Sequence, residues 1–208
     1  MISRPARYAA AALLALTAAS APGSPASAHP PSKTPPQLEL AGVSGAGCPA
    51  GTATVLINPE GSGFTALYDA FEARTTAQAN PAVKACTLTF KVKLDPGYRL
   101  GVRKVDYRGE AALTSRGKAE FKAKYFWQGV ARTQELPGWS KAGVHNGSWQ
   151  ATHTLTEFWG SRCGGNDQLI ITQNLKVSGS GTNVLNMETA DSQYSTVWEL
   201  ETQPCADH

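Results

Sequence analysis

Hydrophobic and polar side chains alternate along much of the chain. In the stretch 88–94, Leu88, Phe90 and Val92 are separated by threonine and lysine. Strict alternation of this kind predicts a strand with one buried face and one face in water. The stretch ends at Asp95-Pro96-Gly97, a sequence typical of a tight turn. The same alternation predicts strands in residues 98–107, 119–127, 169–177 and 194–200.

Two stretches depart from simple alternation. The phase slips by one near Arg103-Lys104, which predicts a β-bulge. Phe64 to Phe71 fits the spacing of an amphipathic helix, but it is only eight residues long and follows Gly61-Ser62-Gly63. Because helices of that length are marginal and the neighbouring segments are strands, we predict a strand here too.

Many short strands separated by glycine, serine, asparagine and proline turns are typical of one class of fold. We predict an all-β protein, an antiparallel β-sandwich or jelly roll. The length of about 160 residues that remains after the N-terminal region predicts a single domain. We expect residues 48–205 to form this domain.

The N-terminal region has the features of an export signal. Arg4 and Arg7 precede an apolar run at residues 9–19, and Ala26-Ser27-Ala28 matches a signal-peptidase cleavage site. We therefore predict a signal peptide at residues 1–28, a secreted, extracellular protein and no membrane span, since the run is shorter than the roughly 20 residues that a span needs. Residues 29–47 contain four of the 13 prolines, and we expect them to form a Pro-rich extended tether.

Four cysteines are present, at Cys48, Cys86, Cys163 and Cys205. An even number in an exported protein predicts two disulfides, and no CxxC spacing indicates a metal site. Of the three connectivities we favour Cys48–Cys86 and Cys163–Cys205, because each closes a loop of about 40 residues at one end of the domain.

The charge of the chain is nearly balanced. Without Arg4 and Arg7 the predicted mature chain has 17 basic and 16 acidic residues, a net charge of +1. This balance gives no global attraction to nucleic acid, so we expect no nucleic-acid partner. We also expect a monomer.

Several short blocks of sequence together resemble a known family. They are Gly47-Cys48-Pro49-Ala50-Gly51-Thr52, Ala85-Cys86-Thr87-Leu88, Val105-Asp106-Tyr107-Arg108-Gly109, Tyr125-Phe126-Trp127-Gln128-Gly129, Cys163-Gly164 and Asp191-Ser192. In this order they resemble the secreted fungal and bacterial family called domain of unknown function 4360. The resemblance spans residues 47–205 and implies secretion, a β-rich fold and four paired cysteines. It implies no particular activity.

Candidate catalytic chemistry is sparse. No GxSxG, HExxH, P-loop or GxGxxG motif occurs, so we predict no catalytic residue, no metal site and no cofactor. His145 and His153 could form a metal site together with Glu157 or Asp167. We prefer the interpretation that both are exposed histidines in a polar loop. A pair of carboxylates for glycoside hydrolysis cannot be recognised from spacing.

A tryptophan-containing segment offers a candidate binding site. Trp139 and Trp149 lie in the polar, glycine-rich stretch 136–150, which we expect to be a loop. Exposed indoles stack on sugar rings, and Asn146 and Gln150 would meet the hydroxyl groups. The alternative is that the segment folds back and both indoles cap the core. Trp127, Trp159 and Trp198 lie in predicted strands and are expected in the core.

A second candidate surface is basic. Residues 84–124 contain 11 basic and 4 acidic residues, a net charge of +7. If their strands share a sheet, Lys91, Lys93, Lys122 and Lys124 project from its solvent side. Such a face would hold an anionic polymer, although lysines on exposed strands also serve simply to prevent aggregation.

Three function classes follow. The first is a non-catalytic binding module for an extracellular polymer, either a glycan or anionic cell-wall material. The second is a protein-binding module, such as a protease inhibitor or host-interaction protein. The third is a hydrolase with an unrecognised carboxylate pair. We favour the first.

Overall fold

The computed structural model describes residues 34–187 and 196–205. The predicted signal peptide at residues 1–28 lies outside this range, as do Asp191, Ser192 and the start of the predicted strand at 194–200. Within the described ranges, every regular element is a strand, and every pair of neighbouring strands is antiparallel. The all-β prediction is confirmed.

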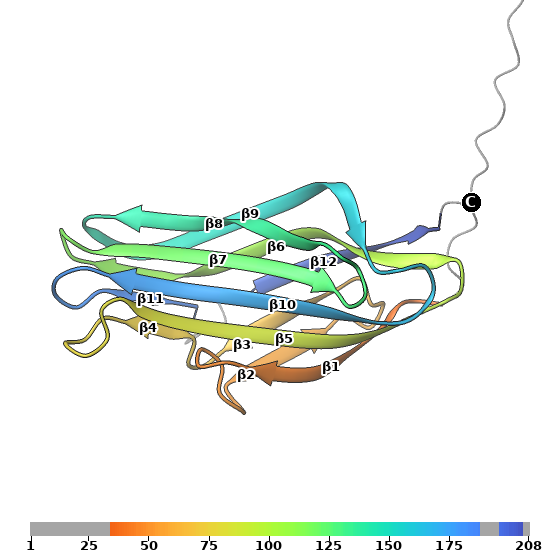
Figure 1. The fold of residues 1–208 in the computed structure, drawn as a ribbon, viewed down its shortest axis with the longest axis horizontal. Coiled ribbons are helices and arrows are strands. Elements are labelled where there is room, and N and C mark those ends of the chain that lie inside the picture. Colours follow the sequence, from red (N-terminus) through yellow and green to blue (C-terminus); the bar gives the residue numbers. More distant parts are fainter. Residues whose placement is uncertain (1–33, 188–195, 206–208) are drawn as a thin grey trace, which may run out of the picture. The chain divides into compact units, whose positions relative to one another are not determined.

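The first sheet has five strands. Figure 1 shows them from top to bottom as β8, β7, β10, β5 and β1. Their bounds, in this order, are Thr133–Ala142, Lys118–Trp127, Gly165–Ser178, Ala82–Leu94 and Gln37–Ser44. The central strand β10 is paired with β5 along one side and with β7 along the other.

The second sheet has seven strands and lies behind the first in Figure 1. Its main path is β2 (Ala53–Ile57), β3 (Gly63–Tyr68), β12 (Thr196–Pro204), β6 (Tyr98–Leu113), β11 (Val184–Asn186) and β4 (Glu72–Arg74). The seventh strand, β9 (His145–Gly160), pairs with β6.

Aromatic side chains from the two sheets meet in one core. Phe64 of β3 packs on Phe90 of β5 with 4.3 Å between ring centroids. The rings of Tyr125 of β7 and Trp198 of β12 meet in a T-shaped arrangement with 5.8 Å between centroids. These contacts join the inner faces of the sheets, as the predicted sandwich requires. Trp127 and Trp198 are buried as expected, whereas Trp159 is partly buried.

The two irregular stretches follow the predictions. Residue Arg103 is skipped in the pairing of β6 with both β12 and β9, so it forms the predicted bulge. Part of the stretch 64–71 is the strand β3, with Phe64 and Tyr68 pointing into the core.

The tether prediction is wrong over part of its length. Residues 37–44 form strand β1, which pairs with β5, and Leu38 and Leu40 pack against the core. Within the predicted tether, the prolines all precede this segment, and its Leu-Glu-Leu alternation gives it one apolar face. The domain therefore begins before Cys48.

Both disulfides join the predicted partners. Cys48 is bonded to Cys86 with 5.3 Å between Cα atoms, and Cys163 is bonded to Cys205 with 5.9 Å. The first bond is in the core and fixes the segment after β1 to β5. The second joins the turn before β10 to the end of β12.

Candidate functional site

The solvent face of the five-stranded sheet is defined by alternation within each strand. On β5, Leu88, Phe90 and Val92 are buried, while Lys91 and Lys93 are exposed. β10 alternates in the same way, and its outward side chains are amides, hydroxyls, a lysine and Ile170. Because the other sheet covers only the inner face, this polar face is open to solvent.

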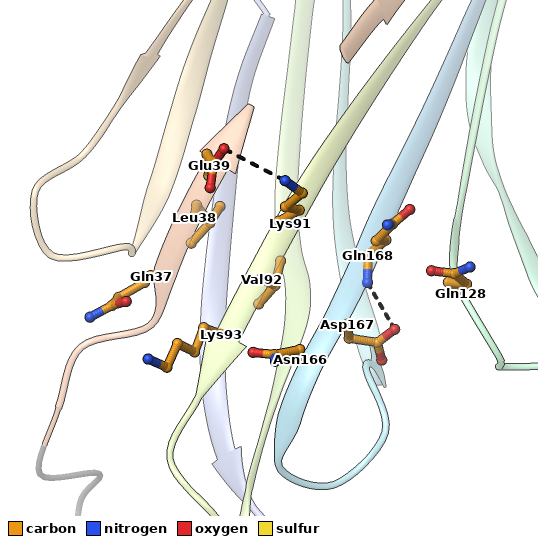
Figure 2. A pocket seen from close by; sticks show the side chains of 10 residues that line it. All are labelled: Gln37, Leu38, Glu39, Lys91, Val92, Lys93, Gln128, Asn166, Asp167 and Gln168. Atoms are coloured by element: carbon orange, nitrogen blue, oxygen red, sulfur yellow. Dashed lines mark hydrogen bonds and ion pairs between the residues drawn. The ribbon is translucent and has the colours of Figure 1, made fainter. Parts of the chain in front are cut away.

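A groove of about 580 Å³ crosses this face at one end of β1, β5 and β10. Figure 2 shows its lining. Gln37 and Glu39 come from β1, and Lys91 and Lys93 come from β5. Asn166, Asp167 and Gln168 come from β10, and Gln128 follows the end of β7.

Amide side chains dominate the chemistry of this groove. Among the described residues, the side chains of Gln37, Gln128, Asn166 and Gln168 form no hydrogen bond, and Lys93 forms no ion pair. Each amide has two N–H donors and one carbonyl acceptor free to bind a ligand. The groove therefore combines several unused donors and acceptors on rigid strands.

The charged groups of the groove differ in their burial and in their bonding partners. Lys91 Nζ lies 3.8 Å from Glu39 Oε1 in an exposed ion pair. Asp167 is buried, and its carboxylate accepts hydrogen bonds from the backbone N–H groups of Arg162 at 3.1 Å and Gln168 at 2.9 Å. Asp167 therefore fixes the turn before β10, whereas the lysine ammonium groups are accessible to a ligand.

A second groove of about 370 Å³ lies on the same face over β7 and β8. Its lining includes Lys122, Lys124, Glu135 and Asn174. Lys122 Nζ is 2.8 Å from the carboxylate of Glu120, and this contact raises the pKa of the lysine above its usual value. Lys122 therefore keeps its positive charge at any physiological pH.

The four lysines expected on one face do share a sheet. Lys91 and Lys93 lie on β5, and Lys122 and Lys124 lie on β7, all four exposed. The strand β10 separates the two pairs. Each pair lines one of the two grooves.

The segment expected to be a tryptophan loop is instead two strands. Thr133–Ala142 is β8 and His145–Gly160 is β9, joined by a short turn at Gly143 and Val144. Each strand finds a partner in a different sheet, β7 and β6 respectively. The polar composition arises because the outward positions of both strands are in water.

The two tryptophans pack at the edge of the core. Trp149 is only 3% exposed, and its Nε1–H donates to the backbone oxygen atoms of Glu110 and Asn186. Its ring is stacked on that of Trp139 with centroids 5.4 Å apart and lies 5.0 Å from Phe121. Trp139 is partly buried. The capping alternative is therefore the one that the structure favours.

Asn146 and Gln150 are exposed on β9, on the opposite side of the strand from Trp149. Gln150 Nε2 donates to Asp106 Oδ1 at 2.7 Å. Burial raises the pKa of Asp106, but hydrogen bonds from Gln150, Thr152 and Arg108 outweigh it and hold that pKa below its usual value. The structure thus does not bring Trp149 together with Asn146 and Gln150.

His145 and His153, the histidines considered as metal ligands, lie on β9 and not in a loop. His145 packs against the ring of Trp139 at 5.7 Å, and the backbone of His153 pairs with Val105. Within residues 34–187 and 196–205, no three His, Cys, Asp or Glu side chains form a group that could hold a metal ion. In the same part of the chain, no helix is long and apolar enough to cross a membrane.

Sequence reasoning missed the amide-lined groove. Asn166 and Gln168 precede the alternating stretch 169–177 and extend its outward set by two positions. Gln37 and Glu39 lie in the segment predicted to be an extended tether, so the sequence did not predict them on a sheet. Extending the alternation toward the glycines at 164 and 165 would have found the β10 part of the site.

The fold, the two disulfides and the grooves define a disulfide-bonded β-sandwich with one exposed polar sheet face. The chain belongs to the family described as Domain of unknown function (DUF4360), whose model matches residues 35–205. It is 24% identical over 189 residues to a protein of Arthroderma benhamiae described as an uncharacterized secreted protein, an alignment that covers 83% of this chain and 74% of the relative.

Two solved structures are distantly similar. One is TmCBM61 in complex with β-1,4-galactotriose, with 11% identity, 78% of this chain and 87% of that chain covered, and a TM-score of 0.30. The other is the enzymatically active domain of tailspike protein 4 from bacteriophage CBA120, with 13% identity, 79% and 19% covered, and a TM-score of 0.26.

Proposed function

We propose that this protein is a non-catalytic extracellular module that binds a polysaccharide on the solvent face of its five-stranded sheet. The observation that carries the proposal is the groove in Figure 2, where four amide side chains form no hydrogen bond among the described residues. Sugar hydroxyl groups both donate and accept hydrogen bonds, and an amide offers both functions.

The position of these amides on a sheet favours binding. Asn166 and Gln168 lie on the part of β10 that pairs with β5, and on the other side the backbone N–H of Gln128 donates to the backbone oxygen of Gln168. Gln37 lies on β1, which also pairs with β5. A backbone held in this way loses little entropy when a ligand binds, so weak polar contacts still yield a net affinity.

Two further observations support the extracellular part of the proposal. Two disulfides are typical of proteins in an oxidising compartment, and the relative from Arthroderma benhamiae is described as secreted. The sequence at residues 1–28 has the features of a signal peptide.

The proposal predicts which substitutions abolish binding. Retention of the purified protein on a panel of insoluble polysaccharides should be lost in N166A/Q168A, because this variant removes two free amides from the groove. The matched control is N146A/Q150A, which removes two exposed amides from β9 on the other sheet. Retention of the control should equal that of the unmodified protein.

The opposite pattern, loss in the control and retention in N166A/Q168A, would place the ligand on β9 and refute the proposal. Release of reducing sugar from any retained polysaccharide would contradict the non-catalytic part. Failure of every polysaccharide to retain the protein, together with inhibition of a protease panel, would favour the protein-binding class instead.

A further inference from the structure

The two lysine pairs flank β10, one pair on each side of the strand. Lys93 and Lys91 on β5 are level with Asn166 and Gln168 of β10. Lys124 and Lys122 on β7 are level with Thr172 and Asn174 of the same strand. Each exposed ammonium group therefore has an amide or hydroxyl side chain directly beside it on β10.

This combination suits a ligand that carries both charge and hydroxyl groups. The ammonium group attracts an anion, while the neighbouring amide or hydroxyl meets a sugar hydroxyl. Because the same combination occurs twice on one strand, the ligand should present the same chemistry at two places along its length.

The composition of the face distinguishes between kinds of anion. Its outward positions on the five strands include six lysines and three glutamates, at Lys91, Lys93, Lys118, Lys122, Lys124, Lys176, Glu39, Glu120 and Glu135. Because the three glutamates offset half of the lysines, the positive charge of the face is modest. A modest charge with neighbouring amides favours a polymer with one carboxylate per sugar over a dense phosphate polymer.

The spacing of the pairs sets a minimum length. The nearest members of the two pairs are Lys91 and Lys124, whose levels on β10 are marked by Gln168 and Thr172, four residues apart. At a rise of about 3.4 Å per residue this separates the two levels by about 14 Å. A single sugar or an isolated anion cannot reach both pairs at once.

We propose, on the basis of the proposed function, that the ligand is a linear acidic polysaccharide of the uronic-acid class. It lies along β10, and its carboxylates contact Lys91 and Lys93 at one end and Lys122 and Lys124 at the other. The uncharged part of the ligand between the two pairs crosses β10 at Ile170, which is level with Thr89 of β5.

Affinity electrophoresis of the full mature chain in gels that contain polygalacturonate tests this proposal. The pair variants K91Q/K93Q and K122Q/K124Q should each weaken retardation about tenfold at low salt, as expected for the loss of two partly exposed charge contacts. Raising the salt to about 0.5 M should weaken the unmodified protein similarly, because salt screens exposed charges. The control R103Q/R108Q removes two positive charges from the other sheet and should leave retardation unchanged.

Chain length provides the second arm. Oligogalacturonides too short to reach about 14 Å should be affected by one lysine pair at most. Longer ones should bind more tightly and respond to substitutions in both pairs. Equal retardation by neutral polysaccharide, with lysine variants unchanged, would overturn this inference and leave the proposed function intact. Preference for inorganic polyphosphate over polygalacturonate would overturn it as well. If N166A/Q168A loses retardation while both lysine variants are retarded normally, the amides alone bind the polymer, and this inference is overturned too.

Discussion

Two buried tyrosines occupy the centre of the sandwich in different environments. The hydroxyl of Tyr68 accepts a hydrogen bond of 2.6 Å from Gln173 Nε2. The hydroxyl of Tyr107 has no hydrogen-bond partner among the described residues, although its side chain is fully buried. A buried hydroxyl without a partner costs free energy, whereas a paired one is stabilising.

The two tyrosines should therefore respond in opposite ways to loss of the hydroxyl. Tyr68→Phe should lower the free energy of unfolding by about 1 to 3 kcal/mol, because it leaves the Gln173 amide buried and without this partner. Tyr107→Phe should leave the free energy of unfolding unchanged or raise it slightly. Urea denaturation measures both, and a Tyr107→Phe variant as unstable as Tyr68→Phe would contradict the assignment.

The same residues predict how stability depends on pH. Burial raises the pKa of Tyr107 well above its usual value, and Tyr68 and Tyr125 raise it further. In the unfolded chain this tyrosine loses its proton near pH 10, while in the folded chain it keeps it. Stability should therefore fall as the pH rises above about 10, by up to about 1.4 kcal/mol per pH unit for this group, and less steeply in Tyr107→Phe.

At the scale of elements, the segment that forms the adjoining strands β8 and β9 differs most from its sequence-based prediction, which was an exposed loop. Trp149 of β9 lies over Gly109 of β6, where an added Cβ would come within 2.8 Å of the indole Nε1. The glycine thus makes room for the ring, and Trp139 covers it from β8. The indole joins the edges of the two sheets.

Truncation of this ring should therefore affect stability. Trp149→Ala should lower the free energy of unfolding by about 3 to 5 kcal/mol, as expected when a buried tryptophan leaves a cavity. Its effect on polysaccharide retention by the protein that remains folded should be negligible. Thermal unfolding monitored by circular dichroism gives the comparison, with Val144→Ala at the exposed turn as the control. If Trp149→Ala leaves stability unchanged but abolishes retention on polysaccharide, the indole contacts the ligand and is not a core residue.

Local patterns were sufficient to predict some of these elements and insufficient for others. Alternation at Leu88, Phe90 and Val92 reports burial directly, so β5 and its outward lysines were predictable. The pairing of β1 with β5 depends on contacts between residues about 50 positions apart, and the preceding prolines concealed it. The inward direction of Trp149 depends on its register against β6, which composition does not determine.

At the scale of the whole molecule, the sandwich separates stability from recognition. Aromatic side chains of both sheets fill the core, and two disulfides fix segments near the ends of the described domain. The outer face of the five-stranded sheet is left with amide, hydroxyl and lysine side chains that the fold does not need. The site could not be predicted as a unit, because its residues come from β1, β5 and β10, which are distant in sequence.

Amide NMR of the ¹⁵N-labelled mature chain during titration with oligogalacturonides tests most directly where the ligand binds. Chemical shifts should change at Gln37, Lys91 and Asn166 and at their neighbours on β1, β5 and β10, with little change on β9. Shifts that change instead around Gln150 and Thr152 of β9, on the other sheet, would contradict this binding site.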